Sequence, residues 1–301
     1  MSAPASGEGA SAAAAAAPAP ASAGAGAGAS AAAGSAPSVL LKPSHPASWL
    51  VLGASGATGR VLVSKLASNP RVSRINAIVR KELPLSHWNV PKPEDAAKIE
   101  QTVVDFGRLP DFADQFKGFD VAASCLGSTR SKAGSKEEFK RQDYDTNVGA
   151  AALVKQGGTF HYSLMSTVGA DPKSMFHYLR TKGELEEALK KEEFPSLAIF
   201  RPGLLLTDRP NESRWGEWLA QKIVPVFHPI LPEKHCGVYV ETVAEAIMQH
   251  SEHVLALRER ADKEAEGQDA AAAPVAQHPF AKPTTRVFLN DEIRALKVAR
   301  L

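Results

Sequence analysis

The stretch Ser48–Arg60, SWLVLGASGATGR, decides the fold of this chain. Its apolar start predicts a buried strand, and the spacing of apolar residues in the VLVSKL that follows predicts an amphipathic helix. Between the two, glycines at positions 53, 56 and 59 allow a tight turn that can approach a pyrophosphate, whose charge a helix N-terminus attracts. The spacing is GxxGxxG, and Arg60 stands where a P-loop has its lysine. The motif therefore favours dinucleotide binding over kinase-type phosphate binding; a tight turn without a ligand is the alternative.

The residues predicted to bind the cofactor in this loop form one continuous run. They are Gly53, Ala54, Ser55, Gly56, Ala57, Thr58, Gly59 and Arg60.

Outward from the loop, short apolar runs alternate with longer helical patterns. Strands are predicted at Ser48–Leu52, Arg74–Val79, Ile99–Val104, Asp120–Cys125, Phe160–Met165, Ser196–Phe200 and Thr285–Leu289. Helices are predicted near Gly59–Ser68, Asp111–Phe116, Lys136–Lys155, Met175–Lys191, Trp215–Ile223, Thr242–His253 and Asp291–Ala299. This alternation is typical of βαβ units and predicts an α/β fold, a Rossmann-type doubly wound parallel sheet with helices on both faces.

Shifts in composition suggest the domain boundaries. Residues 1–47 form a predicted disordered tail, because Met1 to about Ser38 is almost wholly Ala, Gly, Ser and Pro and cannot form a core. We assign 48–206 to an NAD(P)-binding Rossmann domain. Proline, tryptophan and charge break the alternation afterwards, and we assign 207–258 to a small substrate-side subdomain. The acidic, alanine-rich stretch 259–284 reads as a low-complexity insertion, and 285–301 as a strand and helix that pack on the core.

Composition excludes several classes of protein. The 35 Lys and Arg residues nearly balance the 33 Asp and Glu residues, so nucleic acid is not a predicted partner. The two cysteines, Cys125 and Cys236, exclude a disulfide framework and favour a reducing compartment.

No apolar run has the roughly 18 residues of a spanning helix, and no targeting signal is recognisable near Met1. His250 and His253 lie three apart without a third ligand, so no metal is predicted.

The second predicted strand indicates which dinucleotide is bound. An NAD site usually has an acidic residue there to bind the ribose hydroxyls, whereas this chain has Arg80 and Lys81. A guanidinium can bind a 2′-phosphate with paired hydrogen bonds that a carboxylate would oppose. The pair therefore predicts NADP(H), against the alternative of two solvated charges at a strand end.

Three further residues predict proton-transfer chemistry. The fifth strand ends near Ser166, and Tyr178 and Lys182 follow in a YxxxK spacing that places both on one helical face. A cation about 4 Å from a phenol in a shielded site contributes up to about 4 kcal/mol, enough to lower its pKa of about 10 by up to about three units. We therefore predict Tyr178 as the acid and base, Lys182 as its electrostatic partner and Ser166 as the group that orients the substrate.

These motifs together resemble the atypical short-chain dehydrogenase/reductase family of the HIV Tat-interactive protein, close to its fungal mitochondrial-outer-membrane branch. The resemblance runs from Trp49 to about His253 and includes the last strand and helix. The matching segments are LGASGATGR, AIVRKELP, VDF, CLGSTRSKAG, SLMSTVGAD, YLRTKGELE, FRPGLLLTDR and ESRWGEWL. Departures are the long first segment, the inserted stretch before Thr285, and Thr167-Val168 where relatives often carry a second serine and another residue.

The resemblance implies further site residues. Asp105 and Phe106 would lie beside the adenine. Cofactor contacts would also come from Cys125, Leu126, Gly127, Tyr178, Lys182, Arg201, Pro202 and Gly203. Cys125 would contribute only its backbone, and Asn147, which some extended members use to order a water, is not included in the predicted site.

Two functions are compatible with these residues. One is an NADP(H)-dependent oxidoreductase that transfers hydride to or from a small carbonyl or alcohol substrate. The other is an NADP(H)-binding regulator or scaffold that docks other proteins with little or no catalysis. The intact set of Ser166, Tyr178 and Lys182 favours the enzyme. The resemblance implies peripheral association with the mitochondrial outer membrane, with cytoplasm or nucleus as the alternative.

Overall fold

The glycine-rich stretch forms the predicted strand, turn and helix. The computed structural model describes residues 40–127, 135–207, 237–266 and 278–298. Strand β1 spans Ala47–Leu52, and helix α1 spans Ala57–Ala67. The turn between them begins at Gly53, whose φ of 69° lies in the left-handed region that glycine adopts without steric cost.

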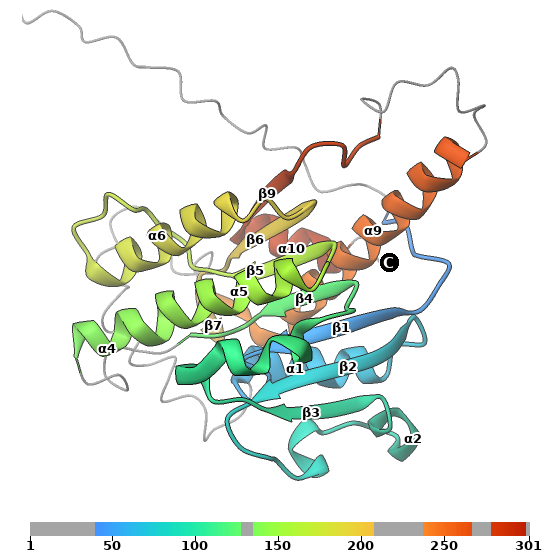
Figure 1. Ribbon diagram of the computed structural model, residues 1–301, viewed down its shortest axis with the longest axis horizontal. Helices are drawn as coiled ribbons and strands as arrows, with labels where there is room; N and C mark the ends of the chain where they lie inside the picture. Colours follow the sequence, from blue (N-terminus) through green and yellow to red (C-terminus); the bar gives the residue numbers. More distant parts are fainter. Residues whose placement is uncertain (1–39, 128–134, 208–236, 267–277, 299–301) are drawn as a thin grey trace, which may run out of the picture. The chain divides into compact units, whose positions relative to one another are not determined.

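Seven parallel strands form one sheet in the order β3-β2-β1-β4-β5-β6-β9 (Figure 1). Besides β1, they are β2 (Val72–Val79), β3 (Ile99–Val103), β4 (Val121–Ser124), β5 (His161–Met165), β6 (Ser196–Arg201) and β9 (Thr284–Leu289). The strand order reverses between β1 and β4, and doubly wound sheets bind ligands at the carboxyl ends of the strands at such a point. The predicted α/β Rossmann-type fold and all seven predicted strands are confirmed.

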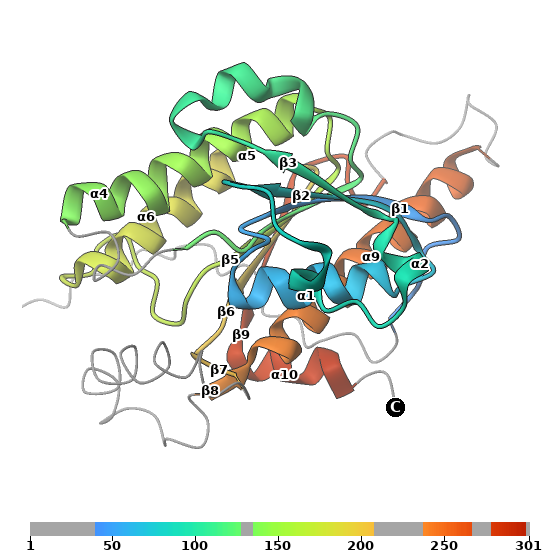
Figure 2. The same ribbon diagram turned by 90° about the horizontal axis from the view of Figure 1, so that it is seen from below.

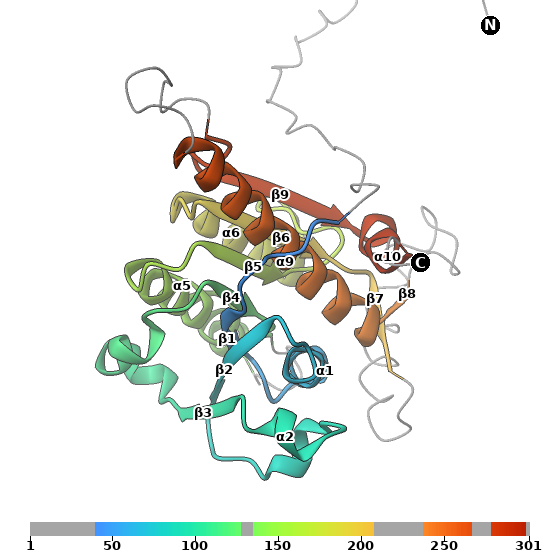
Figure 3. The same cartoon turned by 90° about the vertical axis from the view of Figure 1, so that its right-hand side faces the viewer.

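Helices cover both faces of this sheet. Figures 2 and 3 show α4, α5 and α6 on one face and α1, α9 and α10 on the other. The bounds are α4 Lys136–Lys140, α5 Thr146–Gln156, α6 His177–Lys191, α9 Val240–Glu266 and α10 Asn290–Val298. Shorter elements are η1 Leu85–Trp88, α2 Pro93–Ala96 and the 3-10 segment η2 Phe106–Phe116.

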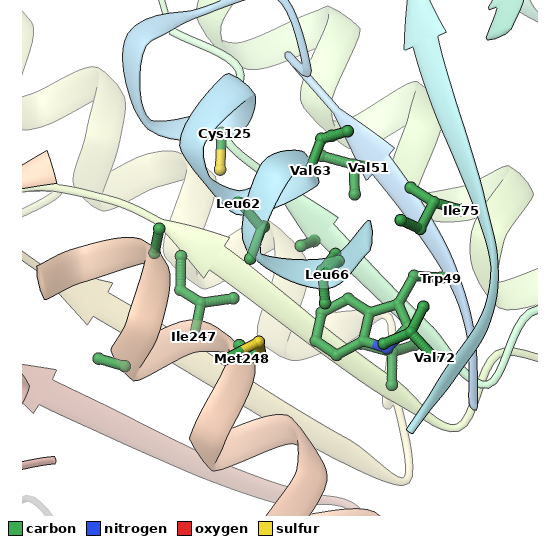
Figure 4. Packing of buried hydrophobic residues seen from close by; sticks show 14 of the residues in the cluster. Trp49, Val51, Leu62, Val63, Leu66, Val72, Ile75, Cys125, Ile247 and Met248 are labelled. Atoms are coloured by element: carbon green, nitrogen blue, oxygen red, sulfur yellow. The ribbon is translucent and has the colours of Figure 1, made fainter. Parts of the chain in front are cut away.

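The apolar run of β1 is buried on both sides. Trp49 and Val51 belong to the cluster that packs against α1 and α9, and Leu50 and Leu52 belong to the cluster on the opposite face. Figure 4 shows the first cluster, in which Trp49 lies with side chains of α1 and α9 around it. A strand of a parallel sheet is covered on both faces, and this explains why the run is continuously apolar.

Three local features were not predicted. The expected single helix Lys136–Lys155 has a π-helical turn, η3, at Arg141–Asp145 between α4 and α5. Helix α9 continues past His253 to Glu266, into the stretch interpreted as an insertion. A small parallel pair, β7 (Leu204–Leu206) with β8 (Gly237–Tyr239), follows β6.

Several predictions lie outside the described residues. They are the tail up to residue 39, the helix Trp215–Ile223 and the middle of the insertion, 267–277. Of the predicted substrate-side subdomain, 237–258 is described, and its α9 packs against α1 in the apolar cluster of the sheet. In the part of the chain that the structure describes, no helix is both long enough and apolar enough to cross a membrane.

Candidate functional site

The glycine loop packs directly against the end of β4. A Cβ atom on Gly53 would lie 2.6 Å from the carbonyl carbon of Cys125 and 2.7 Å from the amide nitrogen of Leu126. A Cβ atom on Gly59 would overlap the carbonyl oxygen of Gly53. Only glycine fits at these two positions, because real Cβ atoms do not approach backbone atoms so closely. The loop therefore packs closely against the end of β4 and the start of α1.

The N-terminus of α1 is suited to an anion. Its N-cap is Gly56, which has no side chain to cap the first amides, and the first turn contains no acidic residue. The first N–H groups and the positive end of the helix dipole are therefore not compensated by a side-chain cap or by an acidic residue in the first turn of the helix. A loop with glycine at positions 53, 56 and 59, beside a helix of eleven residues whose N-cap makes no side-chain hydrogen bond, fits the pyrophosphate of a dinucleotide.

The predicted contacts after β4 lie next to this loop. Cys125 is buried and its amide donates to the carbonyl oxygen of Leu52 over 2.9 Å. Burial raises the pKa of the Cys125 thiol to about 12, so the sulfur stays protonated and unreactive at neutral pH. Gly127 brings this segment close to α6, because a Cβ atom on it would lie 3.7 Å from Nζ of Lys182.

The predicted adenine-side residues lie at the ends of β2 and β3. Arg80 and Lys81 directly follow β2, and both are exposed. Asp105 caps η2 by accepting a hydrogen bond of 2.9 Å from the Gly107 amide. Phe106 is partly buried against the apolar cluster on that face. The two cations thus stand on the same edge of the sheet as the glycine loop, with their side chains in solvent.

Tyr178 and Lys182 lie one turn apart on α6, as predicted. Nζ of Lys182 lies 2.8 Å from Oδ2 of Asp143, and both side chains are inaccessible to solvent, with 4% and 0% exposed. Asp143 comes from the π-helical turn η3. Tyr178 is partly exposed, and its ring contacts Phe139 of α4 at 5.8 Å between centroids. The pair is therefore placed by packing between α4, η3 and α6.

The electrostatics of Tyr178 differ from the prediction. Burial raises the pKa of the phenol, the charge of Lys182 lowers it, the charge of Asp143 raises it, and a hydrogen bond with the Thr167 side chain lowers it; the net shift is upward. We predicted a lowered pKa from Lys182 alone. Burial is the largest effect and Asp143 acts in the same direction, so in the cofactor-free protein Tyr178 is a protonated phenol at neutral pH.

The pKa of Lys182 is also set by several groups. Burial by itself would lower the pKa of this ammonium, but Asp143, Tyr178 and Glu186 act in the opposite direction and raise it. Lys182 therefore stays charged although its side chain is buried.

Ser166 and Thr167 make different contacts at the end of β5. The Ser166 hydroxyl is buried and donates to Oε1 of Glu186 over 2.5 Å. Glu186 also accepts hydrogen bonds from Arg201, whose Nε lies 3.0 Å from the same oxygen. Thr167, one residue later, is buried, and its side chain acts on the Tyr178 phenol by lowering the pKa. Ser166 therefore belongs to a buried network with Glu186 and Arg201, and Thr167 is the residue of this strand end whose side chain acts on the phenol.

The predicted segment Arg201-Pro202-Gly203 leads from the end of β6 to the start of β7. The Pro202 carbonyl oxygen accepts from the Val168 amide over 2.9 Å, and the Gly203 amide donates to Oδ1 of Asn290 over 3.1 Å. These bonds fix the loop after β6 beside the loop after β5 that carries Thr167.

Three site residues were missed from the sequence: Asp143, Thr167 and Glu186. Glu186 lies one helical turn after Lys182, which could have marked it as a member of the same face. Thr167 was noted only as a departure from relatives. Asp143 carried no signal, because its direction depends on the π turn.

His250 and His253 lie in different surroundings. His250 is buried among the rings of His161, Phe200 and Phe288, and Nδ1 of His253 accepts a hydrogen bond from the Leu41 amide. In the described ranges, no group of three or more His, Cys, Asp or Glu side chains is arranged to hold a metal ion.

Comparisons with known proteins agree with this geometry. A protein-family profile described as NAD(P)H-binding matches residues 53–217. Protein HTATIP2 of Rattus norvegicus is 41% identical over 206 residues, which cover 67% of this chain and 80% of that protein. Protein FMP52, mitochondrial, of Candida albicans is 33% identical over 180 residues, which cover 58% of this chain and 75% of that protein.

Solved structures share the fold at low sequence identity. A UDP-N-acetylglucosamine 4-epimerase from Methanobrevibacter ruminantium has a TM-score of 0.51 at 14% identity, covering 69% of this chain and 74% of its own. A UDP-glucose 4-epimerase from Thermotoga maritima has a TM-score of 0.50 at 12% identity, covering 82% and 88%. The likeness extends to the Rossmann-type fold.

Proposed function

Because this chain belongs to the NAD(P)H-binding atypical short-chain dehydrogenase/reductase family that includes HTATIP2 and FMP52, we propose that it is an NADP(H)-dependent oxidoreductase acting on a carbonyl or alcohol. One observation carries the proposal. Tyr178 and the buried, charged Lys182 lie on one face of α6, and Lys182 reaches Gly127 beside the glycine loop. An acid and its cation thus stand next to a cradle for a dinucleotide.

The residues of this site have separate tasks in the proposed reaction. A nicotinamide nucleotide, when bound, supplies or accepts the hydride. Tyr178, a protonated phenol, gives its proton to the substrate oxygen during reduction and takes it back during oxidation. Lys182 stabilises the phenolate that remains after proton transfer. The backbone of Gly53, Gly56 and Gly59 holds the pyrophosphate at α1.

The sequence predicts Ser166 as the residue that orients the substrate, and the hydrogen bond of its hydroxyl to Glu186 favours Thr167 for this task. Ser166 has one hydroxyl proton, and it is donated to Glu186. The Thr167 side chain is buried, directly follows Ser166 and acts on the pKa of the Tyr178 phenol, which supports a place near the substrate oxygen. Thr167→Val should reduce kcat/KM strongly. Ser166→Ala should affect kcat/KM only through the loss of its hydrogen bond to Glu186.

Arg80 and Lys81 support NADP(H) over NAD(H). Both are exposed at the end of β2, where the second strand of a Rossmann fold meets the adenine ribose. Two exposed cations can contact a 2′-phosphate, and the nearest acidic residue in sequence, Glu82, follows them and is also exposed.

We also propose a mitochondrial location, peripheral at the outer membrane. The support is the word mitochondrial in the names of the fungal relatives. Fractionation of the tagged full chain tests this: recovery with mitochondria and release by alkaline carbonate are expected, and recovery only from cytosol or nucleus would contradict it.

Turnover against a panel of aldehydes, ketones and alcohols tests the main proposal. The wild-type protein should oxidise NADPH with at least one carbonyl, and Tyr178→Phe should lose about two to four orders of magnitude in kcat, as expected for general acid catalysis. Binding of NADPH, measured by calorimetry, should be largely retained in the variant. Tight binding without turnover of any compound by wild type would reject the enzyme.

The alternative, an NADP(H)-binding regulator, has one observation in its favour. The hydroxyl of Ser166, the serine predicted to orient the substrate, is buried and donates to Glu186, so it is engaged by the protein itself. For a regulator, Tyr178→Phe would leave both nucleotide binding and the partner proteins unchanged.

A further inference from the structure

A buried carboxylate lies beside the proposed catalytic pair. Asp143 has none of its surface exposed, and its Oδ2 lies 2.8 Å from Nζ of Lys182. Two opposite charges removed from water depend on each other, because either one left alone in the interior is strongly destabilising. The ion pair is therefore a fixed part of the site.

The backbone around Asp143 is specialised. Arg141–Asp145 is a π-helical turn within an otherwise continuous helix from α4 to α5. Such turns are rare, and they often occur at functional sites because the additional residue rotates the following side chains out of α-helical register. At Asp143 the result is a carboxylate directed toward α6.

Asn147 connects this turn to the cofactor side of the sheet. Its Nδ2 donates to the main-chain oxygen of Asp143 over 2.9 Å, and its Oδ1 accepts from the Ser124 hydroxyl over 2.6 Å. Ser124 is the last residue of β4, immediately before Cys125. Lys182 is thus positioned by a chain of contacts that begins at the strand end where the glycine loop packs.

Few charged groups surround the pair in the described part of the chain. Around Tyr178 they are Lys182 on its own helix and Asp143 from η3. Around Lys182 they are Asp143, Tyr178 and, from the next turn of α6, Glu186, which is paired with Arg201 of β6. Asp143 is the group among them that bonds the ammonium directly.

We propose that Asp143 is a positioning residue of this site: its carboxylate fixes the Lys182 ammonium beside Tyr178 and supplies the negative charge against which the Tyr178 proton is held. Its catalytic meaning rests on the proposed oxidoreductase function. The ion pair itself does not, so the test is made first on the protein without cofactor or substrate.

Asp143→Asn tests the proposal because asparagine keeps an oxygen that can accept from Lys182 and removes the charge. Tyrosinate absorbance is titrated in wild type and variant, and the same titration with Tyr178→Phe added isolates Tyr178 from the other three tyrosines. The Tyr178 signal should move to lower pH by about one unit or more, the size of effect expected from a nearby like charge.

Asp145→Asn is the matched control. Asp145 lies on the same π turn, but its side chain is exposed. It should leave the Tyr178 titration unchanged. Equal titrations for wild type and Asp143→Asn, over the pH range in which circular dichroism shows both to be folded, would overturn the proposal. If a substrate is found, the pH profile of kcat should move in the same direction as the titration.

Asp143→Asn leaves Lys182 buried without its partner, so a second comparison covers failure to fold. Lys182→Met is compared with the double variant Asp143→Asn/Lys182→Met. If both fold, Tyr178 should titrate at lower pH in the double variant, and equal titrations would again overturn the proposal. If only the double variant folds, the charges of Asp143 and Lys182 compensate each other in the interior, as proposed. If only Lys182→Met folds, the two charges do not compensate each other, and the proposal fails.

Discussion

At the scale of single residues, Arg80 and Lys81 give a direct test of cofactor choice. Replacing both by alanine should weaken NADPH binding by roughly tenfold to a hundredfold, the range for loss of one or two charge-assisted hydrogen bonds. NADH binding should change little, because NADH has no 2′-phosphate. Isothermal calorimetry with each nucleotide measures both affinities.

A matched pair of cations serves as control for this prediction. Lys190 and Lys191 end α6 on the surface, and changing both to alanine removes the same net charge at a different place. This variant should bind both nucleotides as wild type does. Equal weakening of NADPH and NADH in the Arg80 and Lys81 variant would mean that the two cations do not recognise the phosphate.

The candidate site was only partly predictable from single residues. Tyr178 and Lys182 could be predicted because a helix repeat links them in sequence, and the structure confirms their common face. The upward shift in the pKa of Tyr178 could not, because it depends on burial and on Asp143 from another helix. Ser166 and Thr167 are neighbours, and their roles depend on which hydroxyl faces Glu186.

At the scale of elements, the contact between α1 and the glycine loop can be tested with Gly59→Ala. The added methyl group would overlap the carbonyl oxygen of Gly53, so α1 must move away from the loop. We expect a loss of about 1–3 kcal/mol in the free energy of unfolding, as for other overpacked sites. NADPH affinity should fall at least about tenfold, since a displacement of α1 disturbs the cradle.

Gly157→Ala separates the loss of stability from the loss of NADPH affinity. Its methyl group would overlap the carbonyl oxygen of Phe116, a similar clash where α5 ends. Urea unfolding should show a comparable loss of stability, while calorimetry should show unchanged NADPH affinity. Unchanged affinity in Gly59→Ala would contradict the proposed role of the loop.

Helices and strands with a clear hydrophobic pattern in the sequence could be predicted. Strands that form only by pairing with a distant segment of the chain could not. The strands from β1 to β6 are short apolar runs bounded by helices. By contrast, Leu204–Leu206 follows β6 after only Pro202 and Gly203, and its partner Gly237–Tyr239 comes much later in the chain. The end of α9 was placed too early because its acidic, alanine-rich composition was interpreted as low complexity. Arg258 with Asp262 and Arg260 with Glu264 instead form i,i+4 ion pairs along the helix.

At the scale of the whole molecule, two buried histidines should make stability depend on pH. Burial lowers the pKa of His161 to about 3, against the opposing effect of a hydrogen bond with Ser196. Burial, followed by the charges of His161, Arg286 and His253, lowers the pKa of His250 well below its usual range. Both rings are thus neutral in the folded protein at neutral pH.

The direction of this pH dependence follows from proton linkage. The unfolded chain binds protons to these histidines below about pH 6.5, whereas the folded chain does not, so stability is complete above that pH and is lost as pH falls. For His161 the loss at about pH 5 should be roughly 2 kcal/mol. Urea unfolding between about pH 7.5 and 5 measures it.

His250→Phe should reduce this pH dependence. The ring lies against Phe200 and Phe288, so phenylalanine fits the surroundings and cannot bind a proton. His45→Gln, with a side chain that is 81% exposed in wild type, is the control and should keep the wild-type dependence. An identical pH profile for His250→Phe and wild type would show that His250 is not a source of the acid sensitivity.

The pairing of β9 with β6 has a consequence for biosynthesis. Strand β6 is translated well before β9, and the two meet only after the whole of α9 has been made. Until then the nascent chain presents β6 as an open edge with unpaired amides and carbonyls, the kind of surface that recruits other chains into aggregates. Ribosome-associated chaperones would therefore be needed longest at this edge, which lies three strands away from β1, the strand that leads into the glycine loop.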